Sequence, residues 1–184
     1  MFADLTDYQT ILVSGPQRSG TRFVATAVAH DTGHTYVDEA AISTDSLYQL
    51  LWVRQTTDTP IVVQCPGLCS VLPSLVSHLR STFVVMCLRQ EAEILASQAR
   101  IGWDFEWLER LHYPGFPDEW PVCRRKYHVW RAQREKIPGL YREVWYHTLT
   151  DHPLWVSPEE RGPDWGFSQT KKQEDADALN HGRV

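Results

Sequence analysis

Short apolar runs and amphipathic stretches alternate along the first half of the chain. Continuous apolar runs are typical of strands buried on both faces, and they predict strands at residues 11–13, 35–37, 61–64 and 82–88. Apolar residues at helical spacing predict helices at residues 22–30, 47–51, 71–79 and 91–100. Ser43 or Thr44 is expected to cap the second of these helices. Because strand and helix alternate, we expect an α/β fold, a three-layer α/β/α arrangement with a central parallel sheet.

The pattern changes after residue 101, where proline, glycine and aromatic residues become frequent and indicate turns. A helix is then expected from about 119 to 136, and a last strand from 140 to 148. From residue 157 the chain is polar and shows no periodicity. We therefore predict a single domain over residues 1–156, with an aromatic and basic helical insertion at 102–137, and a polar C-terminal tail over 157–184.

Composition excludes several classes of protein. The 184 residues are 42% hydrophobic and 22% charged, close to the values of globular proteins, which excludes wholesale disorder. The apolar runs, such as Phe83–Leu88, are far shorter than the roughly 20 residues that a membrane span needs. Residues 1–10 contain two aspartates and no basic residue, so no secretory signal is expected. These features favour a cytoplasmic protein without a membrane partner.

The net charge of −5 comes from 18 basic and 23 acidic side chains and argues against a general nucleic-acid coat. One predicted helix face is nevertheless basic. It carries Arg124, Arg125, Lys126, Arg131, Arg134 and Lys136. A solvated face is the plainest interpretation, and the alternative is a surface that receives an anionic donor or acceptor, including nucleic acid. The four cysteines and eight histidines show no metal-ligand spacing, so no metal site is predicted.

The segment between the first strand and the first helix carries the strongest candidate chemistry. It reads Ser14-Gly15-Pro16-Gln17-Arg18-Ser19-Gly20-Thr21, followed by Arg22. A loop that leads from a strand into a helix directs backbone N–H groups and the positive end of the helix dipole towards one point. Its glycines allow the backbone to approach a ligand closely. The segment therefore suits a phosphate group.

The spacing of Gly15 and Gly20 is that of a Walker A loop, G-x-x-x-x-G-K-[ST], but Thr21 stands at the lysine position. The cation of this loop lies inside it, at Arg18. With a strand before it and a helix after it, the loop predicts a nucleotide-binding fold similar to the P-loop nucleoside triphosphate hydrolases.

The string Gly-x-x-Arg-Ser-Gly-Thr resembles the 5′-phosphosulfate loop of P-loop sulfotransferases, in particular the protein-tyrosine and related bacterial enzymes. The likeness extends over roughly residues 10–150. Arg89 ends the strand 82–88 and is followed by Ser97, as in that family. Glu39 follows Arg18 at about the interval of the family's catalytic glutamate, after a stretch that begins at His34. Residues 144–149 resemble the family's late strand.

This resemblance implies a sulfotransferase that moves a sulfuryl group from 3′-phosphoadenosine 5′-phosphosulfate to a hydroxyl acceptor. It implies that the loop holds the 5′-phosphate, that Arg89 and Ser97 hold the 3′-phosphate, and that no metal is required. Arg18 would stabilise the leaving oxygen and Glu39 would be the general base. The cofactor-binding residues would be Gly15, Pro16, Gln17, Arg18, Ser19, Gly20, Thr21, Arg22, Arg89 and Ser97.

Two other functions stay open. The first is an ATP-dependent kinase with Mg²⁺, which phosphorylates a hydroxyl of a nucleoside, a polynucleotide (modified DNA base) or a small molecule, with Asp38 or Glu39 as base. Against it, the Walker lysine is absent, and the strands that end at Gln64 and Arg89 provide no acid for the metal. Asp38 or Asp31 would have to supply that acid. The second alternative is a non-catalytic nucleotide-binding module.

Overall fold

The computed structural model describes residues 1–39, 59–103, 107 and 110–157. The chain divides into two compact units, Met1–Thr148 and Leu149–Val184, and the sheet and α-helices discussed below belong to the first. The predicted helix at 47–51 and nearly all of the predicted tail lie outside the described residues, and the domain boundary at residue 156 stays a prediction. Within the described ranges, no helix has the length and apolar character needed to span a membrane.

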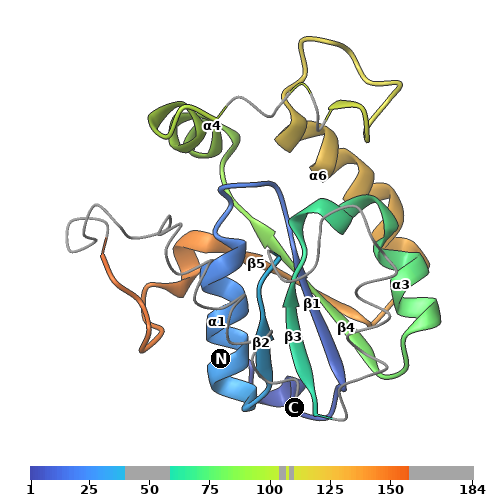
Figure 1. Ribbon diagram of the computed structural model, residues 1–184, viewed down its shortest axis with the longest axis vertical. Coiled ribbons are helices and arrows are strands. Elements are labelled where there is room, and N and C mark those ends of the chain that lie inside the picture. Colours follow the sequence, from blue (N-terminus) through green and yellow to red (C-terminus); the bar gives the residue numbers. More distant parts are fainter. Residues whose placement is uncertain (40–58, 104–106, 108–109, 158–184) are drawn as a thin grey trace, which may run out of the picture. The chain divides into compact units, whose positions relative to one another are not determined.

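Five strands form a parallel sheet with β1 at its centre (Figure 1). They are β1 (Thr10–Ser14), β2 (Thr35–Val37), β3 (Ile61–Gln64), β4 (Thr82–Leu88) and β5 (Tyr141–Trp145), in the order β2-β3-β1-β4-β5. Val13 of β1, for example, is level with Gln64 of β3 and with Val85 of β4. This all-parallel sheet with helices on both faces confirms the predicted three-layer α/β/α fold.

Among the described residues, the α-helices are α1 (Thr21–Thr32), α3 (Leu72–His78), α4 (Glu91–Arg100) and α6 (Val122–Gln133). Short 3-10 helices occupy Ala3–Leu5, Pro66–Val71, Arg134–Lys136 and Tyr146–Leu149. Two predicted boundaries are wrong. The helix expected from 119 begins at Val122, because Pro121 has an extended backbone and a proline disfavours the helical conformation of the residue before it. The strand expected to reach 148 ends at Trp145, where the chain turns into a 3-10 helix.

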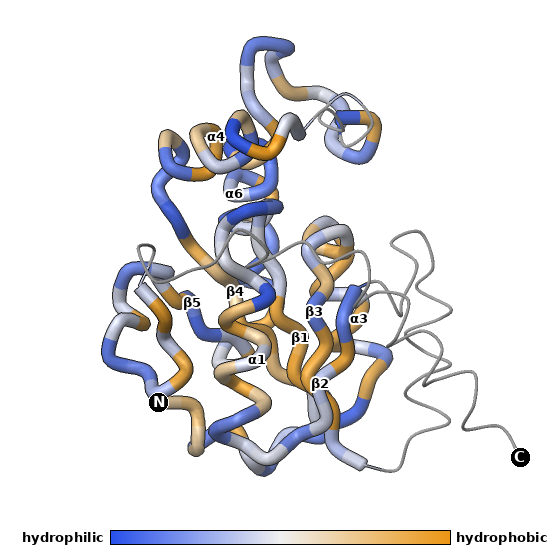
Figure 2. Tube along the Cα trace, turned by 60° about the vertical axis from the view of Figure 1, so that its left-hand side comes forward, coloured by the Kyte–Doolittle hydropathy of each residue, from blue (hydrophilic) through white to orange (hydrophobic). Residues whose placement is uncertain are grey.

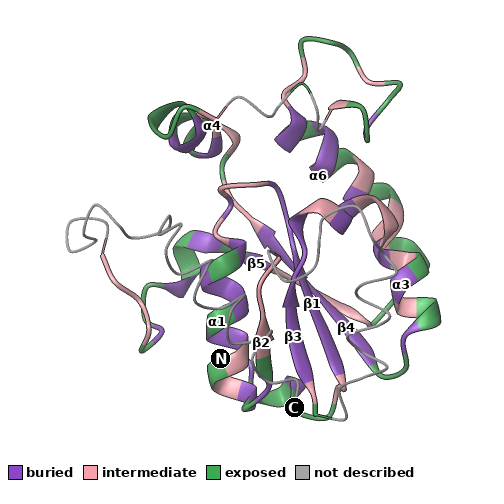
Figure 3. Cartoon of the chain, viewed as in Figure 1, coloured by how far each residue is buried: buried purple, intermediate pink, exposed green. Residues whose placement is uncertain are grey.

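The central strands are buried on both faces of the sheet. Leu12, Val84 and Met86 belong to a core that includes α3 and Trp130 of α6. The opposite face is covered by α1, which packs against β1, β2 and β3. Figure 2 shows these strands as continuous apolar segments and Figure 3 shows them buried. Burial from both sides explains why the strands appear as apolar runs in the sequence, with no polar alternation.

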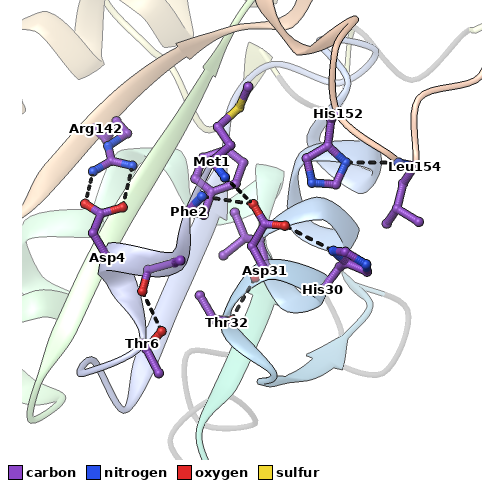
Figure 4. A network of polar contacts seen from close by, with 12 residues as sticks. Met1, Phe2, Asp4, Thr6, His30, Asp31, Thr32, Arg142, His152 and Leu154 are labelled. Carbon is purple, nitrogen blue, oxygen red and sulfur yellow. Dashed lines mark hydrogen bonds and ion pairs between the residues drawn. The ribbon is translucent and has the colours of Figure 1, made fainter.

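The N-terminus is tied to the last turn of α1 and to β5 (Figure 4). The Met1 ammonium and the Phe2 N–H donate to Asp31 Oδ2 at 2.8 and 2.9 Å. Arg142 of β5 pairs with Asp4. Since a helix rises about 1.5 Å per residue, Asp31 lies roughly 15 Å along α1 from Thr21. Asp31 therefore does not supply a metal ligand beside the loop, and that alternative is wrong.

Candidate functional site

The loop between β1 and α1 lies at the carboxyl edge of the sheet, where the strand order reverses. β1 continues through α1 towards β2 on one side, whereas β4 continues through α4 towards β5 on the other. Ligands of open α/β sheets bind at such a switch point. The same edge carries Asp38 after β2, Gln64 at the end of β3 and Arg89 after β4. The fold thus gathers most of the predicted site residues at one edge.

The course of the loop requires glycine at two positions. Gly15 has a φ of 152°, and a Cβ there would lie 2.7 Å from the carbonyl oxygen of Cys87 and 2.8 Å from Ser19 Oγ. Gly20 has a φ of 98°, and a Cβ there would lie 2.2 Å from Cδ2 of Tyr146. The backbone of the loop therefore passes closer to β4 and to the Tyr146 ring than any side chain would permit.

Residues of and after β4 hold the loop in this shape. The Cys87 thiol donates to the Ser19 carbonyl oxygen at 3.0 Å. Burial raises the pKa of this thiol to about 12, so it keeps its proton at neutral pH. Arg89 Nη1 donates to the carbonyl oxygen of Arg18 at 3.1 Å. Arg18 itself has a φ of 71°, a conformation that costs on the order of 1–3 kcal/mol outside glycine. The contacts with β4 and Arg89 offset that strain.

Ser19 and the start of α1 offer hydrogen-bond donors at the loop. Ser19 is fully buried, and its hydroxyl has no hydrogen-bond partner among the described residues. α1 begins directly after Gly20 and has no side-chain cap. The first N–H groups of a helix lack partners within the helix and carry the positive end of its dipole. A buried unpaired hydroxyl costs about 1–3 kcal/mol, which an anion bound in the loop would recover.

Three arginines gather beside the loop, near Ser97 of α4. Arg18 Nε and Arg100 Nη2 donate to Ser97 Oγ at 3.2 and 3.4 Å. Burial, followed by the charges of Arg100 and Arg89, lowers the pKa of Arg18. The mutual repulsion of these groups indicates a positive potential that would attract an anion. The structure thus brings Arg18, Arg89 and Ser97 together, with Arg18 directed at Ser97.

Arg89 is engaged with protein groups on several sides. Its Nε donates to Glu93 at 2.8 Å, and its guanidinium lies over the ring of Tyr146, with Cζ 4.8 Å from the centroid. Its backbone N–H donates to the Tyr127 hydroxyl at 2.8 Å. Together with the bond to the Arg18 carbonyl, these contacts connect the loop with α4 and α6. Arg89 therefore helps to position the loop.

A chain of polar contacts runs from the end of β2 to the start of α1. Asp38 Oδ2 accepts from Arg22 Nη2 at 2.6 Å and lies 2.9 Å from the Tyr36 hydroxyl. The Tyr36 hydroxyl also lies 2.8 Å from Gln64 Oε1, and Gln64 Nε2 donates to Thr21 Oγ1 at 3.3 Å. Burial, followed by the charge of Asp38, raises the pKa of Tyr36, so its hydroxyl stays protonated. This chain fixes Asp38 beside the first turn of α1.

Glu39 follows Asp38 at the same edge of the sheet and is half-buried. Burial, followed by the nearby groups Cys69 and Glu39, raises the pKa of the Cys65 thiol at the end of β3. His34 lies elsewhere. It precedes β2, and its Nε2 lies 2.7 Å from the Tyr8 carbonyl oxygen. Of the stretch from His34 to Glu39, Asp38 contacts α1 directly through Arg22, and Tyr36 is linked to Thr21 through Gln64.

Two basic side chains of α6 turn inward, so the solvated face expected for this helix is wrong at these positions. Arg125 is 3% exposed and donates to the backbone carbonyls of Tyr113, Pro117 and Trp120. Lys126 is 1% exposed, and its ammonium donates to Gln17 Oε1 in the loop and to the Pro66 carbonyl at 3.3 Å. Sequence reasoning counted Lys126 with the basic face and missed it as a site residue, although its spacing from Cys123 and Trp130 places it on the apolar side of the helix and could have indicated its inward direction.

The remaining basic residues of this region stay nearer the surface. Arg124 pairs with Glu91 at 2.5 Å, and Arg134 pairs with Glu143 at 2.7 Å. Arg131 is exposed. Contact with nucleic acid through the segment from Arg124 to Lys136 stays a prediction.

Neither a protein-family model nor a curated protein matches the chain. Among solved structures, the chain is similar to shikimate kinase from Acinetobacter baumannii in complex with shikimate, with 10% sequence identity and a TM-score of 0.45. The alignment covers 100% of this chain and 99% of that chain. The fold class assigned above is defined by the strand order and register of the sheet itself.

Proposed function

We propose that the chain is a nucleotide-dependent kinase, which transfers a phosphoryl group from ATP to a hydroxyl of an acceptor. The observation that carries this proposal is the loop: the buried Ser19 hydroxyl, without a partner in the described part of the chain, lies at the uncapped start of α1. Such a loop at a switch point suits the phosphates of a nucleotide. The acceptor would be a nucleoside, a polynucleotide (modified DNA base) or a small molecule.

The residues at the carboxyl edge have different roles in the proposed phosphoryl transfer. The Ser19 hydroxyl and the N–H groups at the start of α1 hold phosphate oxygens. Glu39 is the general base. It accepts the proton of the acceptor hydroxyl while that oxygen bonds to the terminal phosphorus and the bond to the bridging oxygen breaks. Arg18 stabilises the negative charge that develops on the bridging oxygen.

The carboxylate of Asp38 fits the Mg²⁺ ion that accompanies ATP, while Glu39 keeps the role of general base. This ion, when bound, neutralises phosphate charge. Proteins hold Mg²⁺ with one or two carboxylates together with phosphate oxygens and water. Arg22 and Tyr36 orient Asp38 at the edge of the sheet, and Glu39 is the next residue. This donor set is adequate when the nucleotide contributes its own oxygens.

A sulfotransferase is the second candidate, because arginines surround Ser97 beside the loop. Arg89 and Ser97 would then hold the 3′-phosphate of 3′-phosphoadenosine 5′-phosphosulfate. We prefer the kinase because both residues already hold protein groups. Arg89 bonds Glu93 and the Arg18 carbonyl, and Ser97 accepts from Arg18. A 3′-phosphate would have to displace contacts that position the loop.

Thermal unfolding of the full chain with nucleotides separates the two candidates. The kinase predicts that ATP raises Tm, and that Mg²⁺ increases the shift. A larger, metal-independent shift with 3′-phosphoadenosine 5′-phosphate would favour the sulfotransferase. If neither nucleotide shifts Tm at saturating concentration, nucleotide binding is refuted, because any ligand that binds only the folded state must stabilise it.

A transfer assay then tests catalysis, with the γ-phosphate of ATP labelled and nucleosides, hydroxymethylated DNA and small polyols as acceptors. Glu39→Ala is expected to lower the transfer rate by about 10²–10⁴-fold while ATP binding persists. Glu135→Ala, which removes an exposed glutamate, is the matched control. A binding module would show no transfer in the wild type and no effect of either substitution.

A further inference from the structure

We propose that Lys126 of α6 supplies the ammonium group that binds nucleotide phosphates at the loop. This inference rests on the proposed function of the loop. The Walker A pattern places a lysine directly after its second glycine, and Thr21 stands there in this chain. The structure brings Lys126, distant in the sequence, to the same loop.

The ammonium of Lys126 lies between the ends of two central strands. It donates to Gln17 Oε1 in the loop that follows β1 and to the carbonyl oxygen of Pro66, which comes shortly after β3, at 3.3 Å. Its Nζ also lies 5.8 Å from the centroid of the Tyr113 ring. β1 and β3 are neighbours in the sheet. The charge is therefore held at the carboxyl edge, against the loop for which phosphate binding is proposed.

The helix that carries Lys126 is firmly anchored. Trp130, one turn further along α6, is buried in the core, and its Nε1 donates to Glu143 at 2.7 Å. Arg125, directly before Lys126, fixes the preceding loop through its carbonyls. The backbone at Lys126 is thus held in place. Its ammonium contacts Gln17 from a side chain that is less mobile than that of a surface lysine.

The buried ammonium of Lys126 is held in one place at the loop, where it donates to Gln17 and to the Pro66 carbonyl oxygen. A positive charge fixed away from bulk water interacts more strongly with an anion than an exposed one does. When a nucleotide binds, the ammonium exchanges the Gln17 amide oxygen for phosphate oxygens. A hydrogen bond to an anion is shorter and stronger than one to an amide. Lys126 would in this way provide the charge that Thr21 lacks.

The test compares Lys126→Met, which keeps the stem, and Lys126→Gln, which keeps polar donors, with the exposed control Arg131→Gln on the same helix. Affinities for ATP, ADP and AMP are measured by calorimetry on the full chain. We expect both Lys126 variants to lose at least about tenfold in ATP affinity, with a smaller loss for ADP and the smallest for AMP. Arg131→Gln should match the wild type.

Equal losses for the three nucleotides, or an unchanged ATP affinity, would overturn the proposal. So would failure of both Lys126 variants to unfold cooperatively, because it would assign the lysine to the fold. These outcomes differ from failure of the proposed function. If the wild type binds none of the nucleotides, the kinase itself is refuted. If the wild type binds Mg²⁺ and ATP while the Lys126 variants bind equally well, only this inference fails.

Discussion

The β1–α1 loop and helix α6 meet at Gln17 and Lys126, but they are built by different means. The loop depends on its backbone, since its glycines allow the chain to pass beside Cys87 and Tyr146 where a Cβ has no room. The first part of α6 depends on long side chains, which leave the helix surface and hold groups in other segments. The comparison teaches that a short loop motif can obtain a positively charged side chain from a helix that lies far from it in the sequence.

The largest effect is expected from Gly20→Ala, which tests the backbone side of the comparison. Its Cβ would meet the Tyr146 ring at 2.2 Å, and its φ of 98° is strained for alanine. We expect a loss of about 2–5 kcal/mol in the free energy of unfolding, measured by urea denaturation. Gly33→Ala is the matched control, because its φ is also positive while nothing lies within 4 Å. Its loss should be about 1 kcal/mol. Equal losses would show that the clash with Tyr146 is unimportant.

Arg125→Met tests the second region, helix α6, whose long side chains hold groups of other segments. This substitution removes three hydrogen bonds from a buried guanidinium to the 113–120 segment. We expect it to lower the free energy of unfolding by about 2–3 kcal/mol, because bonds from charged groups are the stronger ones. Arg131→Met, an exposed neighbour on α6, should change it by less than about 0.5 kcal/mol. If the two variants were equally stable, α6 would be the solvated helix that the sequence predicts.

Ser19→Ala should separate ligand binding from stability. The Ser19 hydroxyl makes no hydrogen bond in the described structure, so its removal should leave the free energy of unfolding unchanged or raise it, by up to about 1–3 kcal/mol. Affinity for ATP should fall about tenfold, since a bond to phosphate is lost. Ser14→Ala provides the contrast. Ser14 Oγ donates to the Cys65 carbonyl at 3.1 Å, so this variant should lose about 1 kcal/mol of stability. If Ser19→Ala were less stable than Ser14→Ala, the assignment of Ser19 to phosphate binding would be contradicted.

The smallest effect is expected at Asp4, which lies away from both regions and serves as a reference. Its hydrogen bond with Arg142 lowers the pKa of the Asp4 carboxyl. A lowered pKa contributes stability above the unfolded value of about 3.9, and the contribution is lost as the pH falls through the folded value. Because the pair is solvent-accessible, Asp4→Asn should cost only a few tenths of a kcal/mol at pH 7. Urea denaturation should show a smaller difference in the free energy of unfolding between Asp4→Asn and the wild type at pH 3 than at pH 7. A larger difference at pH 3 would contradict the lowered pKa of Asp4.

The parts of the fold that could be predicted are those decided locally. Buried strands appear as apolar runs, and the loop appears as glycines placed between a strand and a helix. What the sequence could not show depends on contacts between distant segments. The spacing of Lys126 from Cys123 and Trp130 indicates that it faces inward. That its ammonium donates to Gln17 of the loop depends on how α6 packs against the turn after β3, which the sequence does not show. Likewise, nothing near Arg89 in the sequence indicates that it would bond the Arg18 carbonyl.

The central claim is that the loop binds the phosphates of a nucleotide, and amide NMR of the ¹⁵N-labelled chain tests it directly. During titration with ATP and Mg²⁺, the largest shifts are predicted at the backbone amides of Gly15, Ser19, Gly20 and Thr21. Gly33, at the far end of α1, should stay nearly unchanged. Shifts at the loop no larger than those at Gly33, under saturating nucleotide, would contradict the account.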